Sequence, residues 1–208
     1  MERERITISI KKPLLEEIDR TIDGVNIRNR SHAFETLSTK ALNYSDQKNA
    51  VVILGGDDAL KQIPAVKSTL KNLKKYGFIK VYIAVGYLAD KIKEKLGDGK
   101  SFDLKLEYLT EGEGSGGAVL PLKRHFRQTF LVFNSDKAYD LDINKLNNFH
   151  KSKEIFATVV TDDLKNMSGL YVFEPEIFKY IPKGFSMLES DVLPKLAKED
   201  KLIIKPSI

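Results

Sequence analysis

The strongest constraint on the fold is an alternation of short apolar runs with helical patterns that begins at residue 50. The first run, 50–54, is apolar throughout and ends in two glycines, which is typical of a strand buried on both faces before a tight turn. Further strands are predicted at 80–85, 104–109, 130–133, 155–161 and 169–173, and helices at 59–76, 89–96, 143–150, 176–180 and 190–197, with another after 114–117. Strands that alternate with helices predict an α/β fold with a doubly wound, mostly parallel sheet.

Ligands of such sheets bind beyond the carboxyl ends of the strands. Three turns are expected there: the glycine pair after the first strand, the glycine cluster at 114–117, and the polar segment 134–136. The alternative is that the glycines only form turns and that Asp136 caps or solvates a strand end. The candidate ligand-binding residues are Gly55, Gly56, Gly114, Ser115, Gly116, Gly117, Asn134 and Asp136.

The first 43 residues have a different pattern. In residues 5–10 polar side chains alternate with isoleucines, as in a strand with one buried face. Pro13 suits a first helical turn and Gly24 its end, while Asn29 or Ser31 can cap a second helix. So short a segment has too few apolar side chains for its own core, and a lone strand leaves its edge unpaired. The pattern therefore predicts an obligate homodimer, or a higher even oligomer, in which the strand pairs with its twin.

This segment resembles the ribbon-helix-helix DNA-binding proteins over residues 3–43. The resemblance implies that the paired strands read bases in the major groove of double-stranded DNA and that the second helix start holds a phosphate, roles that arginine forks, hydroxyls and free amides can fill. The candidate DNA-binding residues are Arg3, Arg5, Thr7, Ser9, Lys11, Arg28, Asn29, Arg30 and Ser31. The alternative is an amphipathic hairpin of a larger fold, with these polar side chains merely solvated.

Composition bounds the remaining possibilities. The chain has 208 residues, 42% apolar and 30% charged, which is typical of a soluble globular protein of one or two domains. No apolar run reaches membrane-spanning length, and the N-terminus is charged where a secretory signal would be apolar, so a cytoplasmic protein is expected. The chain has no Cys, and its three His residues have no metal-ligand spacing. The net charge of +5 permits nucleic-acid binding without requiring it.

A second resemblance, to sugar-phosphate nucleotidyltransferases, covers roughly residues 49–202. It rests on several pieces in one order: VVILGG at 51–56, EGSGGAVL at 113–120, FLVFNSDKAYDLDINKLNNFHKSK at 130–153, SGLYVFEPEIFKYIPKG at 168–184 and LESDVLPKLAKEDKL at 188–202, besides the segment 73–99. It implies a Rossmann-like domain in which the candidate ligand-binding residues hold a nucleotide or nucleotide sugar. It also implies that Asp136 matches the family's first metal-binding aspartate.

The departures from that family lie where the phosphates would bind. Active members follow the two glycines with a loop whose Arg and Lys grip the triphosphate, whereas here Asp57 and Asp58 follow directly. Negative charge at that place opposes phosphoryl transfer. The family's Glu-Lys-Pro sugar-binding segment and second metal-binding aspartate also have no counterpart. These departures predict a catalytically degenerate domain that senses a ligand or oligomerises.

Two functions from different classes follow. The first is a sequence-specific DNA-binding regulator of transcription, with a ribbon-helix-helix domain at 1–43, a linker at 44–49 and a truncated nucleotidyltransferase-like domain at 50–208, no catalytic residue and no cofactor. The alternative is an active sugar-phosphate nucleotidyltransferase with a DNA-binding appendage, which would need Mg²⁺ at Asp136. A purely structural assembly module is the third possibility.

Overall fold

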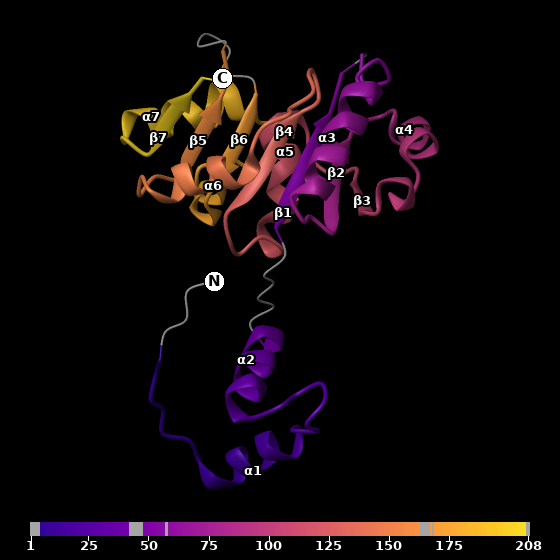
Figure 1. Ribbon diagram of the computed structural model, residues 1–208. Coiled ribbons are helices and arrows are strands. Elements are labelled where there is room, and N and C mark those ends of the chain that lie inside the picture. The colour runs from indigo at the N-terminus through magenta and orange to yellow at the C-terminus, as the bar shows by residue number, and fades with distance from the viewer. Residues whose placement is uncertain (1–4, 42–47, 57, 163–166, 168, 207–208) are drawn as a thin grey trace. The chain divides into compact units, whose positions relative to one another are not determined.

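A computed structural model describes residues 5–41, 48–56, 58–162, 167 and 169–206. The chain divides into two compact units, 1–46 and 47–208, and each is described by itself (Figure 1). Arg3 and most of the predicted linker lie outside the described residues. In the part of the chain that the structure describes, no helix is long and apolar enough to cross a membrane.

The larger unit is built on a seven-stranded sheet with the order β3-β2-β1-β4-β6-β5-β7. Its strands are β1 (Asn49–Leu54), β2 (Lys80–Val85), β3 (Lys105–Leu109), β4 (Phe130–Asn134), β5 (Ala157–Val160), β6 (Leu170–Phe173) and β7 (Leu202–Lys205). The first four strands along the sheet are parallel, β6 runs antiparallel to both its neighbours, and β7 is parallel to β5. The prediction of a mostly parallel α/β sheet is therefore confirmed, with β6 reversed.

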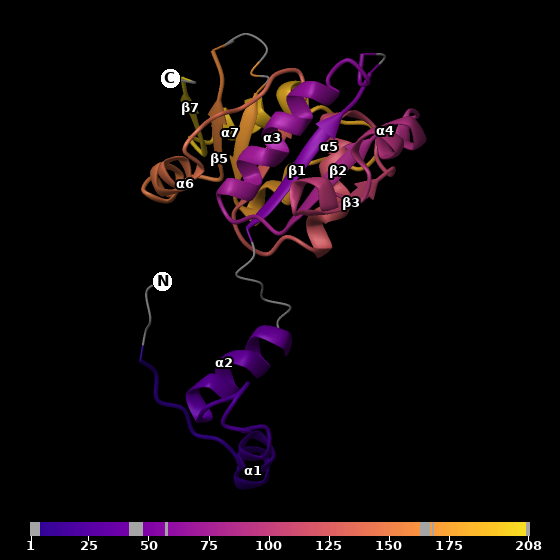
Figure 2. The ribbon, with the colours of Figure 1, turned by 45° about the vertical axis from the view of Figure 1, so that its right-hand side comes forward.

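Helices cover both faces of this sheet (Figures 1 and 2). One core lies under α3 (Ile63–Lys75), α4 (Ala89–Leu96) and α6 (Ile143–Lys151), and the other lies under α5 (Gly114–Val119) and α7 (Leu193–Lys198). Successive residues of β1 alternate between the two cores, with Val52 in the first and Val51 in the second. Each apolar strand therefore packs against one core on each face of the sheet, and this explains why neither face of the strand is polar.

Three details differ from the expected elements. The helix predicted from 59 begins only at Ile63, after turns held by backbone bonds such as Lys61 N to Asp58 O. The helix predicted at 190–197 is a π-helical turn, Leu188–Val192, followed by α7, with Pro194 in the first turn of α7. Strand β7 was not predicted, because it is only four residues long and only partly buried.

The smaller unit consists of α1 (Lys12–Arg20) and α2 (Arg30–Ala41), preceded by an extended segment, residues 5–11. The strand predicted at 5–10 is not formed in the single chain. An isolated strand has no neighbour for its backbone donors and acceptors, and its isoleucines stay exposed, Ile6 to 72% and Ile8 to 53%. Among the described side chains of this unit, only Ile18 and Ala33 are buried. Two helices form in the expected order, but α1 ends at Arg20, four residues before the expected end at Gly24.

Candidate functional site

A cavity of about 450 Å³ lies at the carboxyl ends of four neighbouring strands, β3, β2, β1 and β4. Its walls come from these strand ends, the turns that follow them, the start of α5 and the segment before α7. The lining residues are Ile53, Leu54, Gly55, Gly56, Ala84, Val85, Gly86, Leu109, Glu111, Gly112, Glu113, Gly114, Ser115, Ala118, Asn134, Met187 and Glu189. This is the place where doubly wound sheets bind ligands, so we take the cavity as the candidate site.

Five of the predicted nucleotide-binding residues line this cavity: Gly55, Gly56, Gly114, Ser115 and Asn134. The other three do not. Gly116 and Gly117 are not among the lining residues, and their backbone N–H groups donate to the carbonyl oxygen of Ser186. Asp136 is exposed on the turn after β4, outside the lining.

The glycines of the site serve two different purposes. A Cβ added to Gly55 or Gly56 would meet no atom within 4 Å, so their backbone faces open space at the cavity. A Cβ on Gly112 would lie 2.0 Å from the carbonyl oxygen of Gly117, and one on Gly114 would lie 2.3 Å from that of Ser186. The second pair therefore lets the chain pack against itself and shape the wall.

One wall of the cavity carries a carboxylate held by two hydroxyls. Ser115 Oγ donates to Glu189 Oε2 at 2.6 Å, and Tyr171 Oη donates to Glu189 Oε1 at 2.7 Å. Burial, and then the charge of Glu189, raise the pKa of Tyr171 far above its usual value, so the phenol stays protonated and donates. Glu189 was not predicted from the sequence, because nothing in the 188–202 piece marks that carboxylate as facing a cavity.

The lining is acidic. Among the residues that the structure describes, it contains Glu111, Glu113 and Glu189 and neither Lys nor Arg, while most of its other side chains are apolar. Phosphates would meet repulsion inside such walls, whereas apolar surface and groups that donate hydrogen bonds would be accommodated. The described lining therefore disfavours phosphates inside the cavity.

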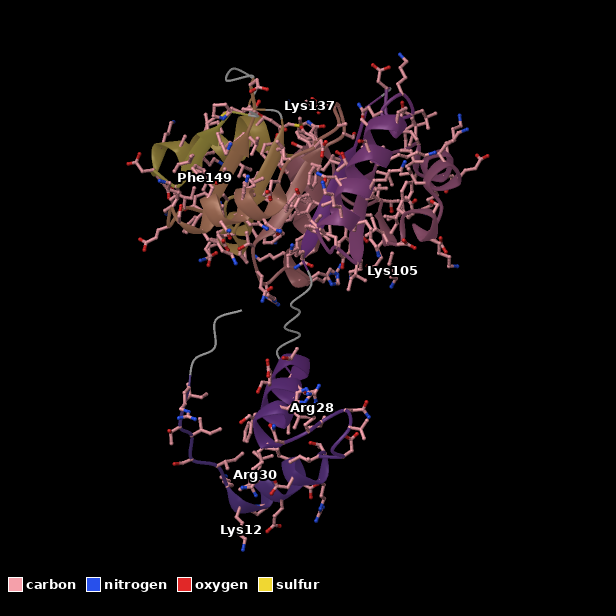
Figure 3. All side chains as sticks on the ribbon, viewed as in Figure 1. Lys12, Arg28, Arg30, Lys105, Lys137 and Phe149 are labelled. Carbon is pink, nitrogen blue, oxygen red and sulfur yellow. The ribbon has the colours of Figure 1, made fainter. Side chains whose placement is uncertain are left out.

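The turn after β4 contains Asp136, which is exposed, and Lys137, which is labelled in Figure 3. It is anchored from behind, because Asn72 Nδ2 donates to the carbonyl oxygens of Tyr139 at 3.0 Å and Leu141 at 3.3 Å. Among the described residues, no group of three or more His, Cys, Asp and Glu side chains could hold a metal ion. Asp136 offers a single carboxylate, which suits Mg²⁺ when substrate phosphates and water supply the remaining ligands.

The turn after β1 has less uncompensated negative charge than its sequence predicted. Asp57 lies outside the described residues, and Asp58 forms an ion pair with Lys61 at 2.6 Å. The C-terminal end of this turn is held next to the end of β4. Ser135, which directly follows β4, donates from its Oγ to the side-chain oxygen of Gln62. The pairing offsets part of the negative charge on which the prediction of a degenerate domain depended.

A doubly wound sheet with a cavity at the carboxyl ends of its strands is the architecture in which many α/β proteins bind their ligands. Residues 47–168, more than half of the chain, match the family Nucleotidyl transferase, and the chain belongs to this family.

Similar proteins are sugar-phosphate nucleotidyltransferases. A UTP--glucose-1-phosphate uridylyltransferase of Synechocystis is 28% identical over 184 residues, which cover 65% of this chain and 47% of the relative. A D-glycero-alpha-D-manno-heptose 1-phosphate guanylyltransferase of Campylobacter jejuni is 28% identical over 151 residues, covering 66% and 67%. The chain thus spans about half the length of the first relative.

Solved structures share the fold. The crystal structure of HddC from Yersinia pseudotuberculosis superposes with a TM-score of 0.61 at 18% identity and covers 77% of this chain and 91% of its own. The same protein complexed with GMP-PN gives a TM-score of 0.58, also at 18% identity, covering 76% and 91%. At this identity the likeness establishes the fold.

These findings contradict the prediction of a DNA-binding regulator with a degenerate second domain, because the family and the relatives are nucleotidyltransferases. The described part of the smaller unit shows where the predicted DNA-binding side chains lie. Arg30 forms a two-bond ion pair with Asp19 at 2.7 Å, and the side chain of Asn29 caps α2 by accepting from His32 N. Arg5, Thr7, Ser9, Lys11, Arg28 and Ser31 are exposed, the first four on the unpaired segment.

Proposed function

We propose that the protein is a sugar-phosphate nucleotidyltransferase that joins a nucleoside triphosphate to a sugar 1-phosphate and releases pyrophosphate. The observation that carries this proposal is the position and lining of the cavity, at the carboxyl ends of β1, β2, β3 and β4 with open backbone at Gly55 and Gly56. The activities named for the relatives from Synechocystis and Campylobacter jejuni support it.

In this proposal the reactants divide between two places. The nucleoside, which is uncharged, occupies the apolar cavity against the glycines at the end of β1. The phosphates lie outside the acidic walls, where Lys61 and Lys137 are the nearest cations along the chain on the turns after β1 and β4. Asp136 would hold Mg²⁺ there, and the ion would neutralise charge on the transferring phosphate.

The reaction itself needs positioning more than covalent participation by the protein. An oxygen of the sugar 1-phosphate forms a bond to the α-phosphorus, the bond to the bridging oxygen breaks, and pyrophosphate leaves with that oxygen. The anchored turn that carries Asp136 keeps its carboxylate at the end of β4, since Asn72 fixes the backbone behind it. Preorganised groups of this kind act without rearranging during the reaction.

A panel assay tests the proposal. Purified protein with Mg²⁺ is incubated with each of UTP, GTP, CTP and dTTP in combination with glucose 1-phosphate or mannose 1-phosphate, and released pyrophosphate is measured. We expect release above the protein-free rate for one preferred nucleotide, and only when the sugar phosphate is present. If no pyrophosphate were released with any pair of nucleotide and sugar phosphate, the proposal would be wrong.

We further propose that two copies of the chain associate through residues 5–10. The segment is extended and unpaired, Ile6 and Ile8 are exposed, and among the described side chains of the unit only two apolar ones are buried. Antiparallel pairing of two such segments about a two-fold axis is self-complementary, and it would cover both isoleucine faces at once. It would also give each copy the core that it lacks alone.

Charge on the isoleucine face should separate the copies. Ile8→Asp places a carboxylate in the paired face, and we expect a dimer to monomer shift in sedimentation equilibrium at micromolar concentration. Val25→Asp is the matched control, because Val25 is also exposed, to 79%, but lies outside the segment. A wild-type chain that sediments as a monomer, or equal behaviour of the two variants, would contradict this association.

A further inference from the structure

We infer that Glu189 is a specificity-determining residue that accepts hydrogen bonds from neighbouring hydroxyl groups on a sugar ring bound in the cavity, an inference that rests on the proposed function. Glu189 belongs to the π-helical turn Leu188–Val192, lines the cavity and is half-buried. Single π-helical turns are rare and often occur at functional sites, because the extra residue redirects side chains. Here the turn brings a carboxylate to the wall formed by Ser115 and Met187.

The carboxylate is fixed in place by donors that are fixed themselves. Ser115 Oγ, which donates to Glu189, accepts from the backbone N–H of Leu188 at 2.8 Å. Tyr171 Oη, which donates to the other oxygen, accepts from the backbone N–H of Gly169 at 3.3 Å. Tyr171 is fully buried, and its ring stacks on Phe173 with centroids 5.4 Å apart. One donor from α5 and one from β6 therefore hold the Glu189 carboxylate in position without any ligand.

Glu189 nevertheless keeps capacity to accept further hydrogen bonds. A carboxylate has about four lone-pair sites, and the two hydroxyls use one on each oxygen. The part of the lining that the structure describes supplies no Lys or Arg to complete the set or to offset the charge. A partly buried carboxylate in this condition favours ligand groups that donate hydrogen bonds and disfavours phosphate.

Ring hydroxyls match this acceptor best. Two neighbouring hydroxyls on a sugar ring can each donate to one oxygen of the same carboxylate, and the ring's C–H surface can lie on the apolar part of the lining, such as Met187 and Ala118. In the proposed reaction such a hydroxyl pair comes from either of two sources, the ribose of the nucleotide or the hexose of the sugar phosphate. The shared chemistry is a pair of hydroxyl donors, and the experiment separates the sources.

The test is calorimetric titration of the full chain with hydroxylated ligands and their deoxy counterparts. The ribose arm compares GTP and UTP with the 2′-deoxy and 3′-deoxy nucleotides, and the hexose arm compares glucose 1-phosphate and mannose 1-phosphate with their deoxy analogues. In one arm we expect loss of a hydroxyl to weaken binding to the wild-type protein by about tenfold or more, as for a hydrogen bond to a charged group.

The variant Glu189→Gln should remove that preference. It preserves shape but loses the charge, so the hydroxylated ligand should bind about tenfold more weakly while the deoxy ligand changes little. Tyr171→Phe removes one of the two hydroxyls that hold the Glu189 carboxylate in position, so it should reduce the same preference in part. Glu94→Gln, on the exposed side of α4, is the matched control for loss of one charge and should bind as the wild type does.

Three results would overturn the inference: equal losses for hydroxylated and deoxy ligands in Glu189→Gln, no discrimination by the wild-type protein in either arm, and no binding of any ligand. Failure of the proposed function is recognised separately. If the hydroxyl preference depends on Glu189 while no pyrophosphate is released with any pair, the transfer proposal fails and the assignment of Glu189 as a hydroxyl-binding residue holds.

Discussion

Replacement of Asp136 by Ala is expected to lower the rate of pyrophosphate release by a factor of 100 or more, roughly what removal of one strong transition-state contact costs. Asp136 is the carboxylate on the turn after β4, beside the phosphate positions of the proposed site. Without it, the metal ion keeps only its phosphate and water ligands. The Mg²⁺ concentration for half-maximal rate should therefore rise as the maximal rate falls. Steady-state rates measured against Mg²⁺ concentration provide the readout.

The same turn contains a matched control. Asp140 is exposed and only four residues further on, so Asp140→Ala removes the same charge from the same anchored segment. We expect it to lower the rate less than threefold, about the effect of a distant surface charge. If both variants lost activity equally, or if Asp136→Ala kept the wild-type rate, Asp136 would not be the metal-binding residue.

The largest effect on stability is expected from Gly112→Ala. The backbone at Gly112 has φ of +92°, where side chains other than hydrogen are strained, and its Cβ would lie 2.0 Å from the carbonyl oxygen of Gly117. The obstructing atoms belong to backbone, so relief requires the start of α5 to move. We expect a loss of about 3 kcal/mol in the free energy of unfolding, or roughly 10 °C in Tm.

Gly55→Ala is the control for this variant. Both glycines line the cavity, but a Cβ at Gly55 would meet nothing within 4 Å and its φ is not positive. We expect Gly55→Ala to change the free energy of unfolding by less than about 1 kcal/mol while it narrows the cavity. Urea titration measures both, and equal stability of the two variants would show that the 112–117 turn tolerates a side chain.

Much of the fold could be predicted, because buried strands such as β1 and β4 consist of apolar side chains except for one terminal asparagine in each. The sequence could not indicate that β6 runs antiparallel to β4, since strand direction depends on the path of the chain between them. Nor did it mark β7, whose four residues pair only at the sheet edge. The alternating pattern of residues 5–10 suits a strand, but in one chain no neighbouring edge satisfies it.

The site was predicted in outline and not in its chemistry. Glycines were predicted to mark a ligand site, and Gly55 and Gly56 line the cavity, yet Gly114 and Gly116 are required because Ser186 packs against them. A single sequence shows which residues are glycines, but it does not show which atoms of the folded chain pack against them. The carboxylate of Glu189 was missed for a related reason, because its partners Ser115 and Tyr171 lie 74 and 18 residues away along the chain.

Similarly, the interpretation of Asp57 and Asp58 as a barrier to phosphates followed from charge counted along the chain. In the folded unit Asp58 is paired with Lys61, so the local balance differs from the count. Arg30, which the sequence suggested as a DNA contact, likewise forms an ion pair with Asp19, eleven residues before it. Charge on a surface acts through its nearest partners, and those depend on the turns of the chain.

The central claim, transfer of a nucleotidyl group to a sugar phosphate, is tested most directly by identifying both products of one reaction. With Mg²⁺, the nucleoside triphosphate preferred in the panel and its sugar 1-phosphate, mass spectrometry should find a nucleoside diphosphate sugar in a one-to-one ratio to pyrophosphate. Omission of the sugar phosphate should abolish both. Pyrophosphate with nucleoside monophosphate and no nucleotide sugar would indicate hydrolysis, and it would contradict the account.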